Sequence, residues 1–379
     1  MTAVNRVLIV GGGVGGLTAA VALRKKGIDV DVLEKNPEHS VYGVGIIQPN
    51  NMLRALDAIG LADECVRRGG AFHQVKVRDR FGAIVGGGSS PADAAPHLPP
   101  TNGITRPILQ EILLTAARDE GAKIRVGVTV KEWSDDGEKV TVISSDGVTQ
   151  DYDLLIGADG LFSQLRSEMF PSAPKPVFSG ESGWRYNLPR PAEVECGELW
   201  YGEKSKVGLV PLSPTLMYIF ICTHEPGNPF MEVEGLAEKM RERLSEYGGL
   251  VADLREQIVD DREVVYKALD HMMLPAPWFK GRAVLIGDAA HATAPHLAQG
   301  AAMAIEDAVL LGELLARDAP IDALLEEFMR RRFERSKLVV ETSAQIINWE
   351  LATWEGPENF NKQAGAAAEK AQRELMKSY

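Results

Sequence analysis

The sequence predicts a protein of the α/β class (α+β overall), in which a mixed β-sheet domain interrupts a nucleotide-binding domain. A β-branched run, RVLIV, is closed by GGGVGG and followed by an apolar-periodic helix and a second strand, DVDVLEK, a pattern typical of a buried parallel sheet. Between residues 171 and 279 this pattern gives way to partly alternating runs such as LMYIFICT, which indicate an antiparallel or mixed sheet. A chain of 379 residues is also longer than one hydrophobic core usually supports.

The glycines after the first strand have the spacing of a dinucleotide-binding turn. Gly11, Gly13 and Gly16 stand in G-x-G-x-x-G register. The first glycine permits the tight turn, the second lets a pyrophosphate approach the backbone, and the third lets the helix pack on the strand. Glu34 ends the second strand, where a carboxylate accepts hydrogen bonds from a ribose hydroxyl and disfavours a 2′-phosphate. The unit is therefore predicted to be Rossmann-like and to bind FAD or NAD.

Composition excludes several classes of partner. The net charge of −12 argues against nucleic acid and against an anionic membrane surface, although one local arginine could still meet a small anionic substrate. Cys65, Cys196 and Cys222 are far apart and lack metal-ligand spacing, so free thiols, a reducing cytoplasm and no metal are expected. The chain enters a strand at once, and no apolar run approaches the roughly 20 residues of a membrane span.

Two later motifs narrow the cofactor. DLLIGADGLFSQLR (residues 153–166) predicts a buried strand, an Asp-Gly turn and a helix, and GDAAHATAPHLAQGAAMAIEDA (287–308) follows another strand. Together with GGGVGG and Glu34, these motifs resemble the single-component FAD-dependent aromatic hydroxylases, a family of flavoprotein monooxygenases, over residues 4–350. The chain is similar to alkylquinolone, urate, hydroxynicotinate and salicylate hydroxylases. It departs from the hydroxynicotinate pattern after GVGI, where Ile47 replaces a histidine.

The resemblance implies a set of cofactor contacts. Arg106 would contact the ribityl-phosphate side of FAD, and Asp288 a ribityl hydroxyl. The backbone N–H groups near Gly300 would face the flavin ring, where a helix N-terminus stabilises negative charge. The full set expected to bind FAD is Gly11, Gly13, Val14, Gly15, Gly16, Glu34, Lys35, Gly45, Ile46, Arg106, Val130, Asp159, Asp288, Gly300, Ala301 and Ala302.

The activity that the resemblance implies is hydroxylation of a small hydroxylated aromatic or N-heteroaromatic ring. NAD(P)H would be a transient co-substrate that reduces FAD, and O₂ would react through a flavin hydroperoxide. The cofactor carries the difficult chemistry, while the protein orients the substrate and excludes water. The alternatives are a flavin-dependent epoxidase or oxidase of a non-aromatic substrate, and a non-catalytic flavin-binding protein.

Candidate substrate residues come from the inserted sheet and from the last motif. His296 is the first choice for a base that ionises a ring hydroxyl, with Tyr186 and His73 second. Arg185, between Trp184 and Tyr186, either reaches solvent or meets a substrate anion or the flavin. Tyr218 and Pro295 are further pocket candidates. His291 is interpreted as structural, because its spacing from His296 is poor for a metal site and further ligands are missing nearby.

The predicted FAD-binding domain is discontinuous and comprises residues 1–70, 98–170 and 280–356. The substrate-binding sheet comprises residues 71–97 and 171–279. Within residues 71–97, a loop rich in Gly, Pro and Ala either closes over the site or lies on the surface. Residues 357–379 are predicted to form a C-terminal helix that either wraps the FAD-binding domain or joins a homodimer. The protein is accordingly expected to be a monomer or a homodimer.

Overall fold

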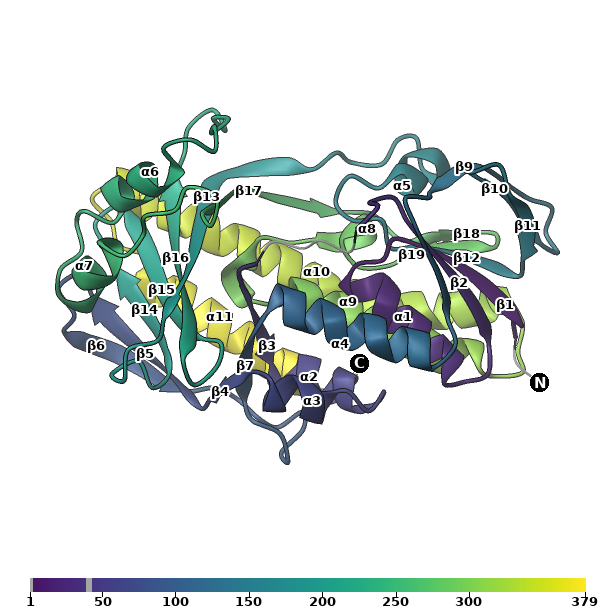
Figure 1. Cartoon of the computed structure of the whole chain (residues 1–379), viewed down its shortest axis with the longest axis horizontal. Helices are drawn as coiled ribbons and strands as arrows, with labels where there is room; N and C mark the ends of the chain where they lie inside the picture. Colours follow the sequence, from purple (N-terminus) through teal and green to yellow (C-terminus); the bar gives the residue numbers. More distant parts are fainter. Residues whose placement is uncertain (1–2, 39–42) are drawn as a thin grey trace.

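A computed structural model describes residues 3–38 and 43–379. The molecule is elongated (Figure 1): a parallel sheet with its helices forms one end, and a second large sheet with two short helices forms the other. The long helix α10 (Ile321–Glu355) runs between the two ends. This arrangement confirms the predicted mixed α/β fold.

The parallel sheet is the core of the first end. Within the described ranges it has six strands in the order β18-β19-β12-β1-β2-β8. Strands β1, β2, β8, β12 and β19 are parallel, and β18 is antiparallel to β19. The bounds are β1 Arg6–Val10, β2 Asp29–Glu34, β8 Lys123–Val126, β12 Leu154–Gly157, β18 Phe279–Lys280 and β19 Ala283–Leu285. β1 sits inside this sheet between β12 and β2, and its apolar residues are buried in the main hydrophobic core.

Helices α1, α4 and α9 pack beside one another against this sheet. Helix α4 begins where Thr105 accepts a hydrogen bond from Ile108 N and Pro107 occupies the first turn. Their bounds are α1 Val14–Arg24, α4 Arg106–Asp119 and α9 Gly300–Leu315. Smaller elements flank them: α2 Asn50–Asp57, α3 Ala62–Arg67, α5 Gln164–Met169, α8 Asp288–His291 and the 3₁₀ turn η1 Pro295–Leu297.

The described chain also has two antiparallel sheets of three strands, one at the parallel-sheet end and one between the two ends (Figure 1). One has the order β11-β10-β9 and the other β3-β7-β4. The bounds are β9 Val130–Asp135, β10 Val140–Ser144, β11 Thr149–Tyr152, β3 Gly45–Pro49, β7 Thr101–Thr105 and β4 Gly70–Phe72.

The second large sheet comes from the segments predicted for the substrate domain. The described residues give it seven strands in the order β17-β13-β16-β15-β14-β5-β6. The bounds are β5 Gln74–Asp79, β6 Ile84–Ser89, β13 Val177–Pro189, β14 Gly197–Tyr201, β15 Ser205–Pro211, β16 Leu216–His224 and β17 Val265–Met273. Helices α6 (Leu236–Arg243) and α7 (Gly249–Arg255) contribute buried residues to the core on one face.

The C-terminal helix α11 (Asn361–Met376) packs on α10 of the same chain and also contacts α2 and η1. Arg54 donates a hydrogen bond to the carbonyl of Met376, and Arg335 donates one to the carbonyl of Leu375. These contacts attach α11 to its own chain. None of the helices in the described ranges combines the length and apolarity that crossing a membrane requires.

Candidate cofactor and substrate site

The glycine turn after β1 has the close contacts that its spacing predicts. Gly11 has a φ of +110°, and a Cβ there would lie 2.2 Å from the carbonyl oxygen of Ala158. A Cβ on Gly16 would lie 1.9 Å from the carbonyl oxygen of Gly11. Helix α1 follows at Val14 without a side-chain cap, which leaves its first N–H groups available to an anion.

Glu34 is fixed beside this turn. Gly12 N donates to its Oε2 at 2.8 Å, and Asn36 N donates to its Oε1 at 2.8 Å. The carboxylate oxygens still have lone pairs for a ribose hydroxyl. Its neighbour Lys35 is exposed, and Val130 is buried in the core. Glu34 thus stands where the sequence places a ribose contact.

A cavity of about 570 Å³ extends from the glycine turn to the second large sheet. Its lining includes these members of the predicted FAD set: Gly13, Val14, Gly15, Gly45, Ile46, Arg106, Asp288, Gly300 and Ala301. Ala302 is fully buried behind this wall. Asp159 is outside the lining and caps α5: its Oδ2 accepts from Gln164 N and Leu165 N. Helix α11 also reaches the cavity, through Gln372 and Met376.

Arg106 and Asp288 enter the cavity from opposite elements, α4 and α8. Both residues are exposed within the cavity, and neither side chain makes a hydrogen bond or an ion pair with another described residue. Desolvation by the surrounding protein lowers the pKa of Arg106, and repulsion by Arg185 lowers it further. Desolvation raises the pKa of Asp288. Charged side chains that converge on a cavity without a protein partner are expected to meet a ligand there.

The N-terminus of α9 faces the same cavity. Gln299 precedes the helix and makes no side-chain cap, because its amide is paired with that of Asn51 at 2.9 and 3.0 Å. Gly300 and Ala301 line the cavity. The helix dipole and the free N–H groups of the first turn would stabilise negative charge there.

A buried ion network fixes the segment that carries Asp288. Arg332 Nε donates to Asp307 Oδ1 at 2.6 Å, and Gly287 N donates to Asp307 Oδ2 at 2.9 Å. His291 Nε2 lies 2.6 Å from the same Oδ2. All of these side chains are buried. His291 therefore stabilises the turn after β19, in keeping with its structural interpretation.

The second sheet presents alternate residues to the cavity. On β13, Gly183 and Arg185 line the cavity, while Trp184 and Tyr186 point into the core beneath α6 and α7. On β16 the cavity side carries Tyr218, Phe220 and Cys222. The Tyr218 ring lies so close to the backbone of Gly45 that a Cβ there would be 2.4 Å from Tyr218 Cδ1. Arg185, Tyr218 and Pro295, the predicted substrate residues, thus all line the cavity, and their contact with a substrate stays a prediction.

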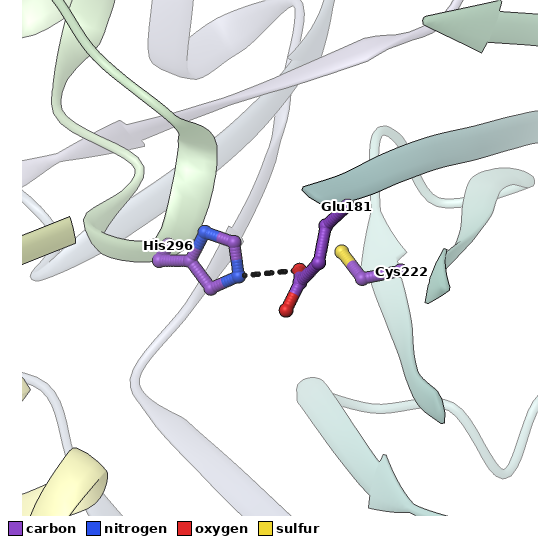
Figure 2. A group of neighbouring side chains, drawn as sticks. All are labelled: Glu181, Cys222 and His296. Carbon is purple, nitrogen blue, oxygen red and sulfur yellow. Dashed lines mark ion pairs between the residues drawn. The ribbon is translucent and has the colours of Figure 1, made fainter. Parts of the chain in front are cut away.

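His296 is part of a second buried network, behind the cavity wall (Figure 2). Its ring points toward Glu181, beside Cys222. Nε2 lies 3.2 Å from Glu181 Oε2 and 3.2 Å from Glu350 Oε2, and the side chain is only 1% exposed. Lys206 Nζ donates to Glu350 Oε1 at 2.5 Å. The backbone of His296 borders the cavity, but its ring nitrogens are closed off from it.

Charges within this network set its protonation. Burial alone would raise the pKa of Glu350, but Lys206 and His296 outweigh burial and hold that pKa at about 2. Burial and Lys206 lower the pKa of His296, whereas Glu350 and Glu181 raise it above its ordinary value. Glu181, Cys222 and His296 could together offer ligand atoms within 4.8 Å of one another. Because Lys206 already supplies the counter-charge, we interpret the group as an ion network.

Comparisons with known proteins agree with this geometry. Residues 5–343 match the family model described as "FAD binding domain". The chain is 32% identical to the putative FAD-dependent monooxygenase YetM of Bacillus subtilis, over 94% of this chain and 96% of that protein. It is 34% identical to the 2-heptyl-3-hydroxy-4(1H)-quinolone synthase of Pseudomonas aeruginosa, over 93% and 90% of the two chains. The protein belongs to the FAD-dependent monooxygenases.

A solved structure of a related enzyme supports the assignment. Klebsiella pneumoniae HpxO, in complex with FAD and uric acid, superposes on this monooxygenase with a TM-score of 0.82 at 25% identity, covering 97% of this chain and 96% of that one. FAD is thus the cofactor of this family. The residues of this chain fit it, because the glycine turn, the unpartnered Arg106 and Asp288, and the N-terminus of α9 all border one cavity, and Glu34 is hydrogen-bonded to that turn.

Two of the proposed bases require correction. Tyr186 lies on the opposite face of β13 from Arg185, where its hydroxyl accepts a weak hydrogen bond from Asp260 N at 3.4 Å. His73 is exposed between β4 and β5, outside the cavity lining. Neither side chain reaches the cavity of the monooxygenase. The ring of His296 is also closed off from it, so we no longer assign direct proton abstraction to these three residues.

The structure adds residues that the sequence interpretation missed. Lys206, Glu181 and Glu350 complete the network around His296, although they come from β15, β13 and α10. Strand β15, SKVGLVP, is buried along its whole length, and Lys206 is its one charged residue. The charge of Lys206 was therefore the feature of the sequence that could have indicated this network. Nothing in the sequence around Glu350 indicated its part in it.

Replacing Glu34 by glutamine is expected to weaken FAD binding by about tenfold, since hydrogen bonds to a charged group contribute roughly 1.5–3 kcal/mol. The amide keeps the shape but offers only one acceptor oxygen. Flavin titration into apoprotein measures the dissociation constant. Glu38→Gln is the matched control, because Glu38 is exposed nearby and has no ion pair with a described residue. Equal affinities for both variants would contradict the ribose role.

Proposed function

We propose that the protein hydroxylates a small hydroxylated aromatic or N-heteroaromatic ring, consuming NAD(P)H and O₂. The observation that carries the proposal is the single cavity, which joins the residues suited to FAD to a sheet face with Arg185, Tyr218 and Phe220. The relatives support the substrate class, since they include a heptylhydroxyquinolone synthase and a urate hydroxylase of Klebsiella pneumoniae, 30% identical over 88% of both chains. The N-heteroaromatic ring is the favoured form.

The residues of the chain then have distinct tasks. FAD, when bound, supplies electron transfer from the nicotinamide and the activation of oxygen. Arg106 and Asp288 would hold the cofactor, and the N-terminus of α9 would stabilise negative charge on it. The apolar wall around Phe220 excludes water from the reacting ring. Lys35, Val130 and Asp159 remain proposed FAD contacts at the nucleotide end.

The test is oxidation of NADH and NADPH by the purified holoenzyme across a library of phenols, hydroxypyridines, quinolones and purines. We expect at least one ring to stimulate oxidation and to gain one oxygen atom from labelled O₂. Stimulation with an oxidised but unlabelled product would favour an oxidase, and a labelled epoxide would favour an epoxidase. A yellow protein that no compound stimulates would favour a non-catalytic flavin carrier.

The proposal also places a monomer or homodimer in the cytoplasm, which sedimentation and cell fractionation can check.

A further inference from the structure

Arg185 has a positive charge that nothing in the described chain neutralises. It is half-buried on the cavity face of β13 and makes neither a hydrogen bond nor an ion pair with another described residue. Of the other charges on the wall, Lys206 is paired with Glu350 and Glu198 with Arg78 at 2.8 Å, while Arg106 and Asp288 are unpaired and are expected to meet the cofactor. Asp288 acts on the pKa of Arg106, and Arg106 has its own expected partner in the cofactor. The guanidinium of Arg185 is therefore left without a partner in the described chain or an expected one in the cofactor.

The surroundings of Arg185 suit a bound oxygen anion. Gly183 lets the guanidinium lie close against the strand on the cavity side, because a Cβ there would be 3.3 Å from Arg185 Nη2. Burial raises the pKa of Tyr218 to about 12, so its hydroxyl is protonated and can donate a hydrogen bond. That hydroxyl has no hydrogen-bond partner among the residues described. Arg185 and Arg106 both act electrostatically on Tyr218, which places the three groups near one another.

Among the described residues of the cavity wall, Glu198 is paired with Arg78 and Asp288 is expected to contact the cofactor, and no further free base is available to create such an anion. The ring of His296 is closed off, and burial raises the pKa of the Cys222 thiol to about 12. Tyr218 is protonated as well. Beside Arg185, a neutral ring hydroxyl would meet a cation and the Tyr218 hydroxyl as a donor, and neither accepts its proton. An uncompensated charge in an enclosed site is costly, so an anion that enters already ionised would relieve that cost.

We propose that the substrate enters as an anion and that its negatively charged oxygen binds to Arg185 with Tyr218 as second donor. This inference rests on the proposed function, since it names the charge of the ring that the enzyme would hydroxylate. The shared chemistry is an anionic oxygen on a planar ring, either a phenolate-type oxygen or a carboxylate. It separates this enzyme from one built for a neutral alkylated ring.

Binding to the oxidised holoenzyme tests the inference without turnover, with the flavin absorbance as readout. Benzoate and benzamide form one matched pair, and 4-nitrophenol and 4-nitroanisole form the other. We expect wild type to prefer at least one anionic member by about tenfold or more, since a charge-assisted hydrogen bond is roughly twice as strong as a neutral one. Arg185→Gln should lose that preference. Arg262→Gln, at an exposed position, should keep it.

Each outcome decides the matter. Preference for benzoate assigns a carboxylate, whereas preference for 4-nitrophenol that grows as it ionises assigns a phenolate-type oxygen. Equal binding of charged and neutral members to wild type would overturn the inference, and so would an unchanged preference in Arg185→Gln. Loss of FAD from Arg185→Gln would overturn it too, by assigning Arg185 to the cofactor. If anion preference holds but no ring is hydroxylated, the proposed function fails while the binding site stands.

Discussion

Arg332→Met is expected to lower the free energy of unfolding by about 3–5 kcal/mol, because it removes one partner from a fully buried ion network. Arg332 is 0% exposed and lies between two carboxylates. Its Nη1 donates to Glu306 Oε2 at 2.7 Å, and its Nε donates to Asp307 Oδ1 at 2.6 Å. Methionine fills similar space but leaves a buried negative charge without its cation.

Arg332→Met should also weaken FAD binding, through Asp307. That carboxylate accepts the hydrogen bond from Gly287 N and pairs with His291, so it holds the turn from which Asp288 enters the cavity. The substitution affects Glu306 less, because Arg335 Nε also donates a hydrogen bond to its carboxylate at 2.6 Å. We therefore expect a larger loss of stability in the FAD-bound protein than in the apoprotein.

Urea unfolding of both forms, followed by circular dichroism, measures these two effects. Arg330→Met is the control, since Arg330 lies on the same helix with an exposed side chain. Its free energy of unfolding should stay within about 0.5 kcal/mol of wild type. If Arg332→Met unfolds at the same urea concentration as wild type, the network does not stabilise the fold as we argue.

The nucleotide end of the site could be predicted from sequence because its chemistry is local. Gly11, Gly16 and Glu34 lie within one βαβ unit, and their contacts follow from the turn and the next strand end. Asp288 and Gly300 could be placed for the same reason: each stands beside the start of a helix in a continuous motif. In these segments the backbone geometry alone decides where these residues lie.

The substrate face could be predicted only in part. Strand alternation puts Arg185 on one face and Trp184 and Tyr186 on the other, but protein covers both faces of this sheet. Polarity therefore gave no clear sign of which face borders the cavity. The choice depends on where α6 and α7 pack, and these helices come some fifty residues later in the chain.

His296 shows a different limit. The motif places its backbone beside the cavity correctly, yet the direction of its ring depends on Glu181 and Glu350. Glu181 is more than a hundred residues away in the sequence. Glu350 lies on a different helix, α10. Ion partners so distant leave no local pattern, so a side chain that looked catalytic turns out to face a buried network.

Glu350→Gln is expected to have the second large effect. It should lower the free energy of unfolding by about 3–5 kcal/mol at pH 7, because it leaves the buried Lys206 ammonium without its carboxylate partner. The pKa of Glu350 in the folded protein is about 2, below its ordinary value of 4.5. A depressed carboxyl pKa stabilises the fold above pH 4.5, and this contribution is lost as the pH falls toward 2. The difference between wild type and variant should therefore be full at pH 7 and shrink steadily below pH 4.5.

A double-mutant cycle separates the ion pair from the packing around it. Lys206→Met and Glu350→Leu should each be destabilising, while the double variant should recover part of the sum, since it leaves neither charge unpaired. Glu341→Gln on the exposed side of α10 is the control and should leave stability nearly unchanged. Strict additivity in the cycle would contradict the pairing. Because the network also anchors the wall at Pro295, Glu350→Gln should lower the yield of hydroxylated product per NAD(P)H in enzyme that still binds FAD.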